Sequence, residues 1–355
     1  MTRRTFAAAL PALAAGPHAE VALITHADGP HLSGYIDGLA KTPEVGNVYL
    51  CDPTAATEAA VRKGLGGKLS SVYKSPAALF AAQKPPLALI TMEAGLAPPA
   101  IHAALDANCH VMAEKPACVR FSDFAPLAAK AKQRNRHLML ALANRVDPVV
   151  QEALRIVRSG SIGKIFGCEL HIIADQTRLG RPGYHNSWTA KKARAGGGHL
   201  IWLGIHWIDL AMYLTGSRIR QVAGFTSNVG GQPLDIEDSA VVAMRFDNGT
   251  NGTLTSAYFL DRGYHSFIKI WGSQGWLCVQ KHTDNPLEWY TNSEKKIQRY
   301  TGPLEPSGYT PFVGHVVRAS LGAAPPLTTD DSVLALKAVF AAYRAAESGA
   351  TQDIS

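Results

Sequence analysis

Residues 21–53 read VALITHADGPHLSGYIDGLAKTPEVGNVYLCDP. The apolar run at 21–24 predicts a buried strand, the stretch at 32–39 predicts a helix reached through a glycine-containing turn, and residues 48–52 predict a second strand. A strand, a helix and a strand in this order predict two parallel strands joined by a crossover helix. Ligands of such sheets bind beyond the carboxyl ends of the strands, so the turn at 25–31 is a candidate binding site.

The same alternation continues to residue 113. Helices are predicted at 55–63, 76–82 and 99–107, and strands at 71–73, 87–90 and 110–113. Strands that alternate with helices at this spacing form a parallel sheet with helices on both faces. The predicted fold class is therefore α/β, with a doubly wound parallel sheet in the first part of the chain.

The turn after the first strand departs from the dinucleotide-binding pattern Gly-x-Gly-x-x-Gly. Glycine is favoured there because it lets the backbone approach a pyrophosphate at a helix N-terminus. Thr25 and Ala27 stand at the first two glycine positions, and Gly29 follows them. These three residues are the expected cofactor contacts of the turn. Asp28 would place a negative charge near the phosphates unless the loop turns it away.

Asp52 follows the second predicted strand, where a carboxylate can bind both ribose hydroxyls of a dinucleotide and repel a 2′-phosphate. This position favours NAD over NADP as the cofactor. The alternative is that Asp52 and Pro53 form a turn that starts the next helix.

Length and composition set further limits. The chain has 355 residues, 46% of them hydrophobic, which suits two globular domains at about 150 residues each. The net charge is +7, but lysine and arginine are scattered, so no nucleic-acid partner is expected. The five cysteines lie far apart without zinc-ligand spacing, so no metal site is expected.

The N-terminus reads TRRTF at 2–6, followed by an alanine-rich stretch at 7–16. A charged start, a weakly apolar stretch and small residues resemble a twin-arginine export signal, assigned here to residues 1–18. The signal predicts a periplasmic protein, and the alternative is an alanine-rich extension of a cytoplasmic one. The apolar stretch is shorter than the roughly 20 residues that span a bilayer, so no membrane anchor is expected.

The second half of the chain is dominated by successive strands. They are predicted at 164–173, 221–226, 241–246, 252–260, 266–271 and 276–280, several of them joined by hairpin turns. The closing segment at 332–348 is amphipathic with helical spacing, and we expect it to pack back on the first domain.

Two motifs connect the chain with a known family. Met-Ala-Glu-Lys-Pro-Ala at 112–117 follows the fifth predicted strand, and Gly-Gly-Gly-His-Leu-Ile-Trp-Leu-Gly-Ile-His-Trp-Ile-Asp-Leu occupies 196–210. In this order they resemble the family of glucose-fructose oxidoreductase, inositol dehydrogenase and the rhizopine-catabolism protein MocA. The resemblance implies a dinucleotide-binding Rossmann domain at 19–143. It also implies a second α/β domain at 144–355, with a large, mostly antiparallel open sheet that binds substrate and makes homo-oligomer contacts in a dimer or tetramer.

The resemblance also implies a reaction, the transfer of a hydride between a nicotinamide and a hydroxyl-bearing carbon of a sugar, cyclitol or sugar acid. Such chemistry needs a base and a cation that favours the alkoxide. Lys115 matches the family lysine that binds the reacting oxygen near the cofactor, and His206 matches the catalytic histidine. The alternatives are an exposed lysine at a strand end and a buried structural histidine. Thr91 and Glu114 are further expected cofactor contacts.

One position departs from the family pattern. Many members have an aspartate four residues before the histidine, and here that position is Trp202. Trp202 is expected either to stack on the apolar face of a sugar ring or to be a core aromatic. Asp209, three residues after His206, is a possible replacement carboxylate at the substrate, although helical spacing favours a structural role for it.

Three other residues are candidate substrate contacts. Tyr184 and Arg194 lie in the segment before the glycine motif, which is otherwise interpreted as a solvated loop. Glu93 follows the fourth predicted strand, beside the expected position of the nicotinamide, where it could bind substrate or move a proton.

Three functions remain open from the sequence. The first is an NAD-linked oxidoreductase acting on a small carbohydrate or polyol, with a tightly held cofactor if the export signal operates. The second is a redox-neutral, NAD-dependent glycoside-cleaving enzyme. The third is a non-catalytic descendant that binds a sugar or a partner chain, suggested by Thr25, Ala27 and Trp202.

Overall fold

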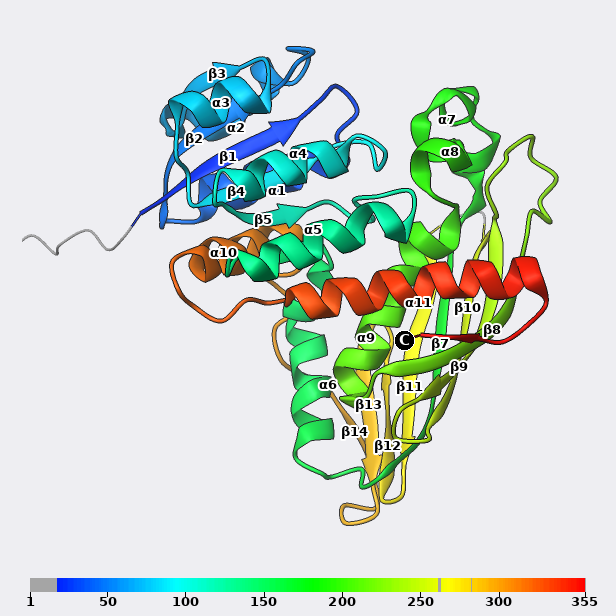
Figure 1. Ribbon diagram of the computed structural model, residues 1–355. Helices are drawn as coiled ribbons and strands as arrows, with labels where there is room; N and C mark the ends of the chain where they lie inside the picture. The colour runs from blue at the N-terminus through cyan, green and yellow to red at the C-terminus, as the bar shows by residue number, and fades with distance from the viewer. Residues whose placement is uncertain (1–17, 261–262, 282, 355) are drawn as a thin grey trace, which may run out of the picture.

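The computed structural model describes residues 18–260, 263–281 and 283–354. Within them the chain forms two sheets, one in each half, with helices packed on both (Figure 1). The segment interpreted as an export signal falls almost entirely outside the described residues.

The first sheet is parallel throughout and has the strand order β3-β2-β1-β4-β5-β6. Its strands are β1 (Ala19–Thr25), β2 (Val45–Cys51), β3 (Leu69–Tyr73), β4 (Leu87–Thr91), β5 (His110–Ala113) and β6 (Leu138–Leu140). The connecting helices are α1 (Leu32–Lys41), α2 (Glu58–Leu65), α3 (Pro76–Ala82), α4 (Ala97–Asp106) and α5 (Phe121–Gln133). The strand order reverses between β1 and β4, which is the position where open parallel sheets bind ligands.

Both faces of this sheet are buried, as the continuous apolar runs of its strands require. Ala22 and Ile24 face one core, and Leu23 faces the other. Helix α10 (Tyr309–Ser320) comes from the far end of the chain and covers the second core beside α1. The two helices approach closely, because a Cβ atom at Gly38 would lie 2.7 Å from the Val313 Cβ atom.

The second sheet has nine strands in the order β14-β13-β12-β11-β7-β10-β9-β8-β15. Its strands are β7 (Ile165–Asp175), β8 (Ile219–Ser227), β9 (Ser239–Phe246), β10 (Asn251–Leu260), β11 (Tyr264–Gly272), β12 (Gly275–Val279), β13 (Leu287–Thr291), β14 (Ile297–Arg299) and β15 (Gln352–Asp353). Only β7 and β10 pair in parallel, and the other pairs are antiparallel. The predicted fold class, a Rossmann sheet followed by a mostly antiparallel open sheet, is confirmed.

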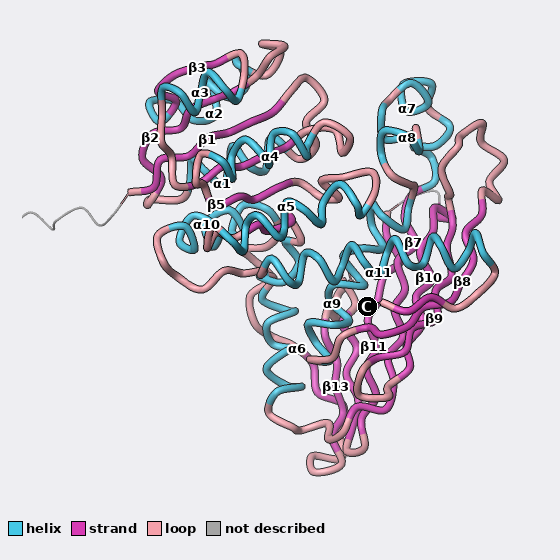
Figure 2. Tube along the Cα trace, in the orientation of Figure 1, coloured by secondary structure: helices cyan, strands magenta, loops and turns pink. Residues whose placement is uncertain are grey.

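Helices α6 (Pro148–Arg158), α9 (Ile205–Thr215) and α11 (Thr329–Ser348) pack against one face of the second sheet (Figure 2). Helix α11 also returns to the first domain, as expected. Its N-terminal turn lies beside the edge strand β6, where the Leu138 amide donates to Thr329 Oγ1 at 2.9 Å and the Leu140 amide donates to Ser332 Oγ at 3.1 Å. The helix therefore satisfies the free edge of the parallel sheet and joins the two halves.

None of the helices in the described part of the chain is both long and apolar enough to cross a membrane.

Candidate active site

A groove of about 610 Å³ lies at the carboxyl ends of β1, β2 and β4, where the strand order reverses. Its wall includes the loop after β1, from Thr25 to Asp28, and the residues after β2, with Cys51 and Thr54. The expected contacts Thr25 and Ala27 are therefore both in the groove. Asp28 lines it too, so the loop does not turn this residue out of the groove.

Gly29 explains how a threonine fits at the start of this loop. A Cβ atom at Gly29 would lie 2.4 Å from Thr25 Oγ1 and 2.7 Å from the Thr91 carbonyl oxygen, which is too close for any side chain. The hydroxyl of Thr91 donates to the Pro30 carbonyl and holds the loop against β4. Glycine is thus required at position 29 by the bulk of Thr25 and the closeness of β4.

Asp52 is fully buried, and its acceptor positions are filled by its own loop. Oδ1 accepts from the amide and hydroxyl of Thr54, and Oδ2 accepts from the amide and hydroxyl of Thr57, all between 2.6 and 2.8 Å. Burial raises the pKa of Asp52, but these hydrogen bonds outweigh burial and lower the pKa below its ordinary value. In this arrangement Asp52 forms the helix-starting turn and presents no free acceptor to a ribose.

Glu93 and Arg194 pair with each other across the groove wall. Arg194 Nε lies 2.7 Å from Glu93 Oε1, and a second nitrogen contacts Glu93 Oε2. Glu93 follows β4, whereas Arg194 belongs to the short helix α8 (Lys192–Ala195) of the second domain. Trp188 makes a second link between the domains, because its Nε1 donates to the Asp28 carbonyl at 3.3 Å. Glu93 and Arg194, both predicted to contact substrate, therefore bind each other and link the two domains at the groove.

Lys115 follows β5 and is buried, with 3% of its surface exposed. Its ammonium donates to the Trp202 carbonyl at 2.9 Å, lies 4.2 Å from the centre of the Trp202 ring, and is 3.8 Å from Glu114 Oε1. Burial lowers the pKa of Lys115 to about 8, against the opposing effect of the Glu114 carboxylate. The alternative interpretation, that Lys115 is an exposed lysine at a strand end, is therefore wrong.

His206 lies in the first turn of α9 and is also buried. Burial lowers the pKa of His206 well below its ordinary value, and the nearby Lys115 cation lowers it further. Among the described residues no group hydrogen-bonds to its Nδ1. The imidazole is therefore neutral and lacks the orienting carboxylate that the family pattern provides.

Trp202 belongs to the π-helical turn Leu200–Gly204 that leads into α9. Its ring lies 5.1 Å from the Trp188 ring and supports the Lys115 ammonium. Two further atoms beside Lys115, Trp202 Nε1 and Glu114 Oε1, are buried and have no hydrogen-bond partner among the described residues. Buried polar atoms of this kind are costly unless a ligand satisfies them, so with His206 Nδ1 they mark a polar site around the ammonium.

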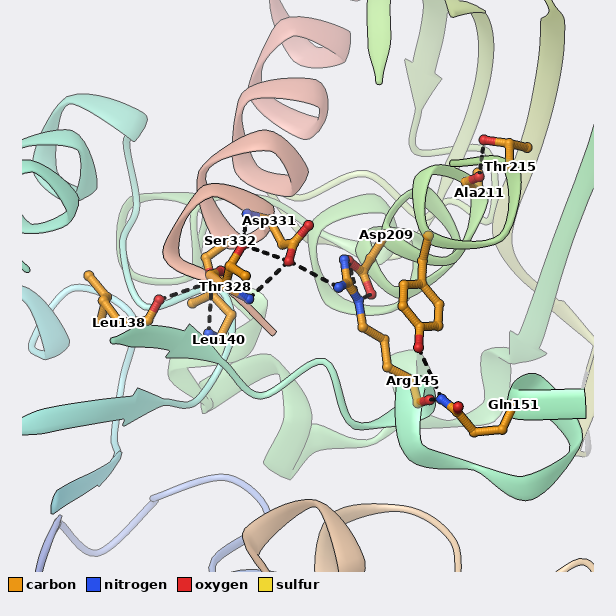
Figure 3. Close-up of polar contacts among 11 residues, drawn as sticks. Leu138, Leu140, Arg145, Gln151, Asp209, Ala211, Thr215, Thr328, Asp331 and Ser332 are labelled. Carbon is orange, nitrogen blue, oxygen red and sulfur yellow. Dashed lines mark hydrogen bonds and ion pairs between the residues drawn. The ribbon is translucent and has the colours of Figure 1, made fainter. Parts of the chain in front are cut away.

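Asp209 does not belong to this polar site. Arg145 binds both of its oxygens, with Nε 2.9 Å from Oδ2 and a terminal nitrogen 2.6 Å from Oδ1, and it also contacts Asp331 at 3.1 Å (Figure 3). Asp209 has the structural role that helical spacing favoured. The interpretation of Asp209 as a replacement carboxylate at the substrate is therefore wrong. The cluster fastens α9 to the N-terminus of α11.

Tyr184 lies on α7 (Pro182–Asn186) and packs with Leu179 and Tyr258. Burial raises the pKa of its hydroxyl. Tyr184 therefore lies on a short helix and packs in a small apolar cluster. It does not lie in a solvated loop, which was the alternative interpretation.

The structure adds one residue that the sequence analysis missed. His31, at the start of α1, places Nδ1 2.9 Å from Glu114 Oε2, and the hydroxyl of Tyr35 donates to the same oxygen. The pattern offered only a weak signal, a histidine directly after the glycine-containing turn at the carboxyl edge of the sheet.

Within the described ranges, no group of three or more histidine, cysteine, aspartate or glutamate side chains is arranged to hold a metal ion.

Relatives with assigned activities match this chain along much of its length. Levoglucosan dehydrogenase of Pseudarthrobacter phenanthrenivorans is 27% identical over 234 residues, which cover 58% of this chain and 59% of that protein. D-glucoside 3-dehydrogenase of Escherichia coli is 25% identical over 334 residues, which cover 86% of this chain and 90% of that protein.

Solved structures share the fold over nearly the whole chain. An oxidoreductase domain protein from Kribbella flavida superimposes with a TM-score of 0.85 at 22% identity, covering 96% of this chain and all of that one. Levoglucosan dehydrogenase in complex with NADH and levoglucosan gives a TM-score of 0.83 at 18% identity, covering 94% and 99%.

Two family models match successive parts of the chain. Residues 29–142 match the oxidoreductase family with an NAD-binding Rossmann fold, and residues 150–278 match the GFO/IDH/MocA C-terminal domain. Together with the two sheets and the lysine at the carboxyl edge of β5, these matches show that the chain belongs to the GFO/IDH/MocA family of oxidoreductases.

Proposed function

We propose that this protein is an NAD-dependent dehydrogenase that oxidises a hydroxyl-bearing carbon of a sugar, cyclitol or sugar acid. The observation that carries the proposal is the buried Lys115 ammonium, surrounded by three polar atoms without partners among the described residues. A hydroxyl group placed there would accept from Lys115 and meet a donor at Trp202 Nε1. Family membership and the named activities of the relatives support the same reaction class.

The groove fits a dinucleotide. It lies at the reversal of strand order, and its volume of about 610 Å³ is that of a ligand site. Thr25, Ala27 and Gly29 would hold the phosphates, and Cys51 and Thr54 would lie beside the adenosine. When bound, the nicotinamide supplies the carbon that accepts or returns a hydride. Asp52 closes its own loop here, and its negative charge still disfavours a 2′-phosphate, which supports NAD over NADP.

Lys115 stabilises the oxygen that becomes negative as its proton leaves. With a pKa of about 8, about nine-tenths of the lysine carries its charge at pH 7, and a fixed cation in a buried site acts without rearrangement. Trp202 is 9% exposed and packs against Trp188 as a core aromatic, and its carbonyl fixes the direction of the ammonium.

Screening tests the reaction. Levoglucosan, methyl β-D-glucoside, D-glucose and myo-inositol are each mixed with NAD⁺ or NADP⁺, and reduced dinucleotide is followed by absorbance. We expect turnover with at least one compound, faster with NAD⁺, and at least about a 1,000-fold loss in Lys115→Met. Equal rates in that variant would remove Lys115 from the reaction. Release of free glucose from the glucoside without net reduced dinucleotide would indicate the redox-neutral alternative.

The proposal includes a homo-oligomer, a dimer or tetramer, formed through the second sheet. On the face away from α6, α9 and α11, large side chains are exposed, among them Phe225, Val241 and Trp271. Phe225 and Val241 are cross-strand partners, so their exposed side chains lie next to each other on this face. Exposed apolar side chains on an uncovered sheet face favour a subunit interface.

The proposal also places the protein in the periplasm, through the export signal at residues 1–18. Replacing Arg3 and Arg4 by lysine should retain the protein in the cytoplasm, as fractionation would detect. Unchanged distribution would contradict export by this route.

A further inference from the structure

The imidazole of His31 is bound by the carboxylate of Glu114, and the proposed function gives this pair no role. His31 Nδ1 lies 2.9 Å from Glu114 Oε2, although the residues are 83 positions apart. A carboxylate oxygen can only accept, so Nδ1 carries the proton of this contact and Nε2 keeps a free lone pair. Holding one ring nitrogen in this way fixes the tautomer and direction of a general base.

The same carboxylate connects His31 with the lysine of the candidate active site. The second oxygen, Glu114 Oε1, is 3.8 Å from Lys115 Nζ and has no hydrogen-bond partner among the described residues. Glu114 therefore lies between an imidazole and an ammonium.

His31 differs from both neighbours in its exposure. About 40% of its side-chain surface is exposed, against 1% for Glu114 and 2% for Lys115. Tyr309 of α10 stacks on the ring at 4.4 Å, and Tyr35 of α1 donates to the shared carboxylate. The ring is thus fixed on one face and at Nδ1, while part of it stays open to a ligand or to water.

His206 is poorly suited to take a proton. It is buried beside the Lys115 cation, and no described residue supports its Nδ1. The family's aspartate position is Trp202, which has no carboxylate to stabilise an imidazolium. His31 has what His206 lacks, namely a carboxylate partner and an exposed edge.

We propose that His31, oriented by Glu114, is the proton acceptor of this enzyme when the hydroxyl-bearing carbon is oxidised. The inference rests on the proposed function. The C–H electron pair leaves as hydride to the nicotinamide, the hydroxyl proton passes to His31 Nε2, and the C=O double bond forms. In the reverse direction His31 returns the proton. Lys115 stabilises the oxygen in both directions, and His206 stays neutral as a hydrogen-bonding group.

The first test uses His31→Gly in the NAD-saturated full-length protein. The backbone of His31 has φ = 56°, a conformation that glycine adopts readily, so this change avoids strain and leaves space for free imidazole. With the compound that the wild-type enzyme oxidises fastest, we expect kcat/KM to fall about 100- to 10,000-fold and added imidazole to restore at least about a tenfold gain. His31→Asn, which fills the space, should lose activity without rescue.

Two control variants accompany this test. His102→Asn removes an exposed histidine on α4 and should match the wild type. His206→Ala should lose activity without imidazole rescue. NADH affinity, measured by fluorescence, should change less than about threefold in His31→Gly. A loss of affinity with kcat retained would make His31 a dinucleotide anchor and overturn the proposal, as would a loss of activity that imidazole does not restore.

The second test does not depend on a substrate. In the ¹⁵N NMR spectrum of histidine-labelled, NAD-saturated protein, the signal absent from His31→Gly should report the tautomer with the proton on Nδ1. The opposite tautomer would overturn the proposal. If the wild-type enzyme oxidises none of the four screened compounds, the proposed function fails on that result, and the tautomer still decides whether Glu114 orients His31.

Discussion

Lys115, the residue proposed to stabilise the reacting oxygen, lowers the stability of the fold. The Lys115 ammonium is 3% exposed, and the nearest carboxylate oxygen, Glu114 Oε1, lies 3.8 Å away. Below pH 8 the lysine is charged, and burying this charge costs free energy of folding. Because the pKa of Lys115 is about 8 in the folded chain and 10.5 in the unfolded chain, the charged lysine destabilises the fold fully below pH 8, and this penalty is lost as the pH rises from 8 to 10.5.

This penalty predicts that Lys115→Met stabilises the protein while abolishing turnover. At pH 7 the free energy of unfolding should rise by up to about 3 kcal/mol, and the difference from the wild type should shrink as the pH increases from 8 to 10.5. Urea unfolding at several pH values measures the difference. A variant less stable than the wild type at pH 7 would show that Lys115 contributes to folding.

The sequence predicts some of the residues that lie around Lys115 and not others, for identifiable reasons. Lys115 and His206 stand in contiguous motifs, so their positions could be matched directly. The His31 to Glu114 contact joins residues 83 positions apart and depends on a left-handed backbone at His31, which no local pattern specifies. The ion pair of Asp209 with Arg145 is likewise a long-range contact.

Among the secondary-structure elements, the strands and helices that bury a complete apolar run are predicted from the local sequence pattern. Strand β5 and helix α3 begin and end at the predicted residues. Helix α10 was not predicted, because Pro311 and Gly314 are helix breakers and its apolar face is satisfied by α1, far away in sequence.

The short helix α8 supplies a second prediction. Arg194 and Glu93 bridge the two domains at the groove, so removing the bridge should let a bound dinucleotide leave faster. Arg194→Met should raise the rate of NADH release about three- to tenfold in stopped-flow fluorescence, and it should lower the free energy of unfolding by about 1 to 3 kcal/mol because the Glu93 carboxylate, 7% exposed, loses its partner. The matched control is Lys192→Met. Lys192 lies on α8 like Arg194, and its exposed ion pair is with Glu347 of α11. Equal release rates in the two variants would contradict a gating role for the bridge.

At the scale of the whole molecule, α10 and α11 join the two domains, and the exposed sheet face leaves room for another copy of the chain. The predicted fold class is confirmed at this scale because alternating strands and helices, followed by successive strands, allow few architectures.

Phe225→Glu tests the proposed interface. Phe225 is 75% exposed within one chain and pairs with Val241 across strands, so a charge there should repel a second copy without disturbing the core. Light scattering should detect a shift to smaller assemblies, while circular dichroism stays unchanged. An unaltered mass would place the subunit contact elsewhere, and Arg220→Glu, at an exposed position on the same strand, controls for charge alone.

The proposed reaction transfers a carbon-bound hydrogen directly to the nicotinamide, and isotope labelling measures this transfer. Wild-type protein and Lys115→Met are incubated with NAD⁺ and with myo-inositol or D-glucose deuterated at every carbon, and the reduced dinucleotide is analysed by mass spectrometry. With the compound that reacts, the wild-type product should carry one deuterium, and the variant should form almost none. Reduced dinucleotide without deuterium, or equal formation by the variant, would contradict hydride transfer at this lysine.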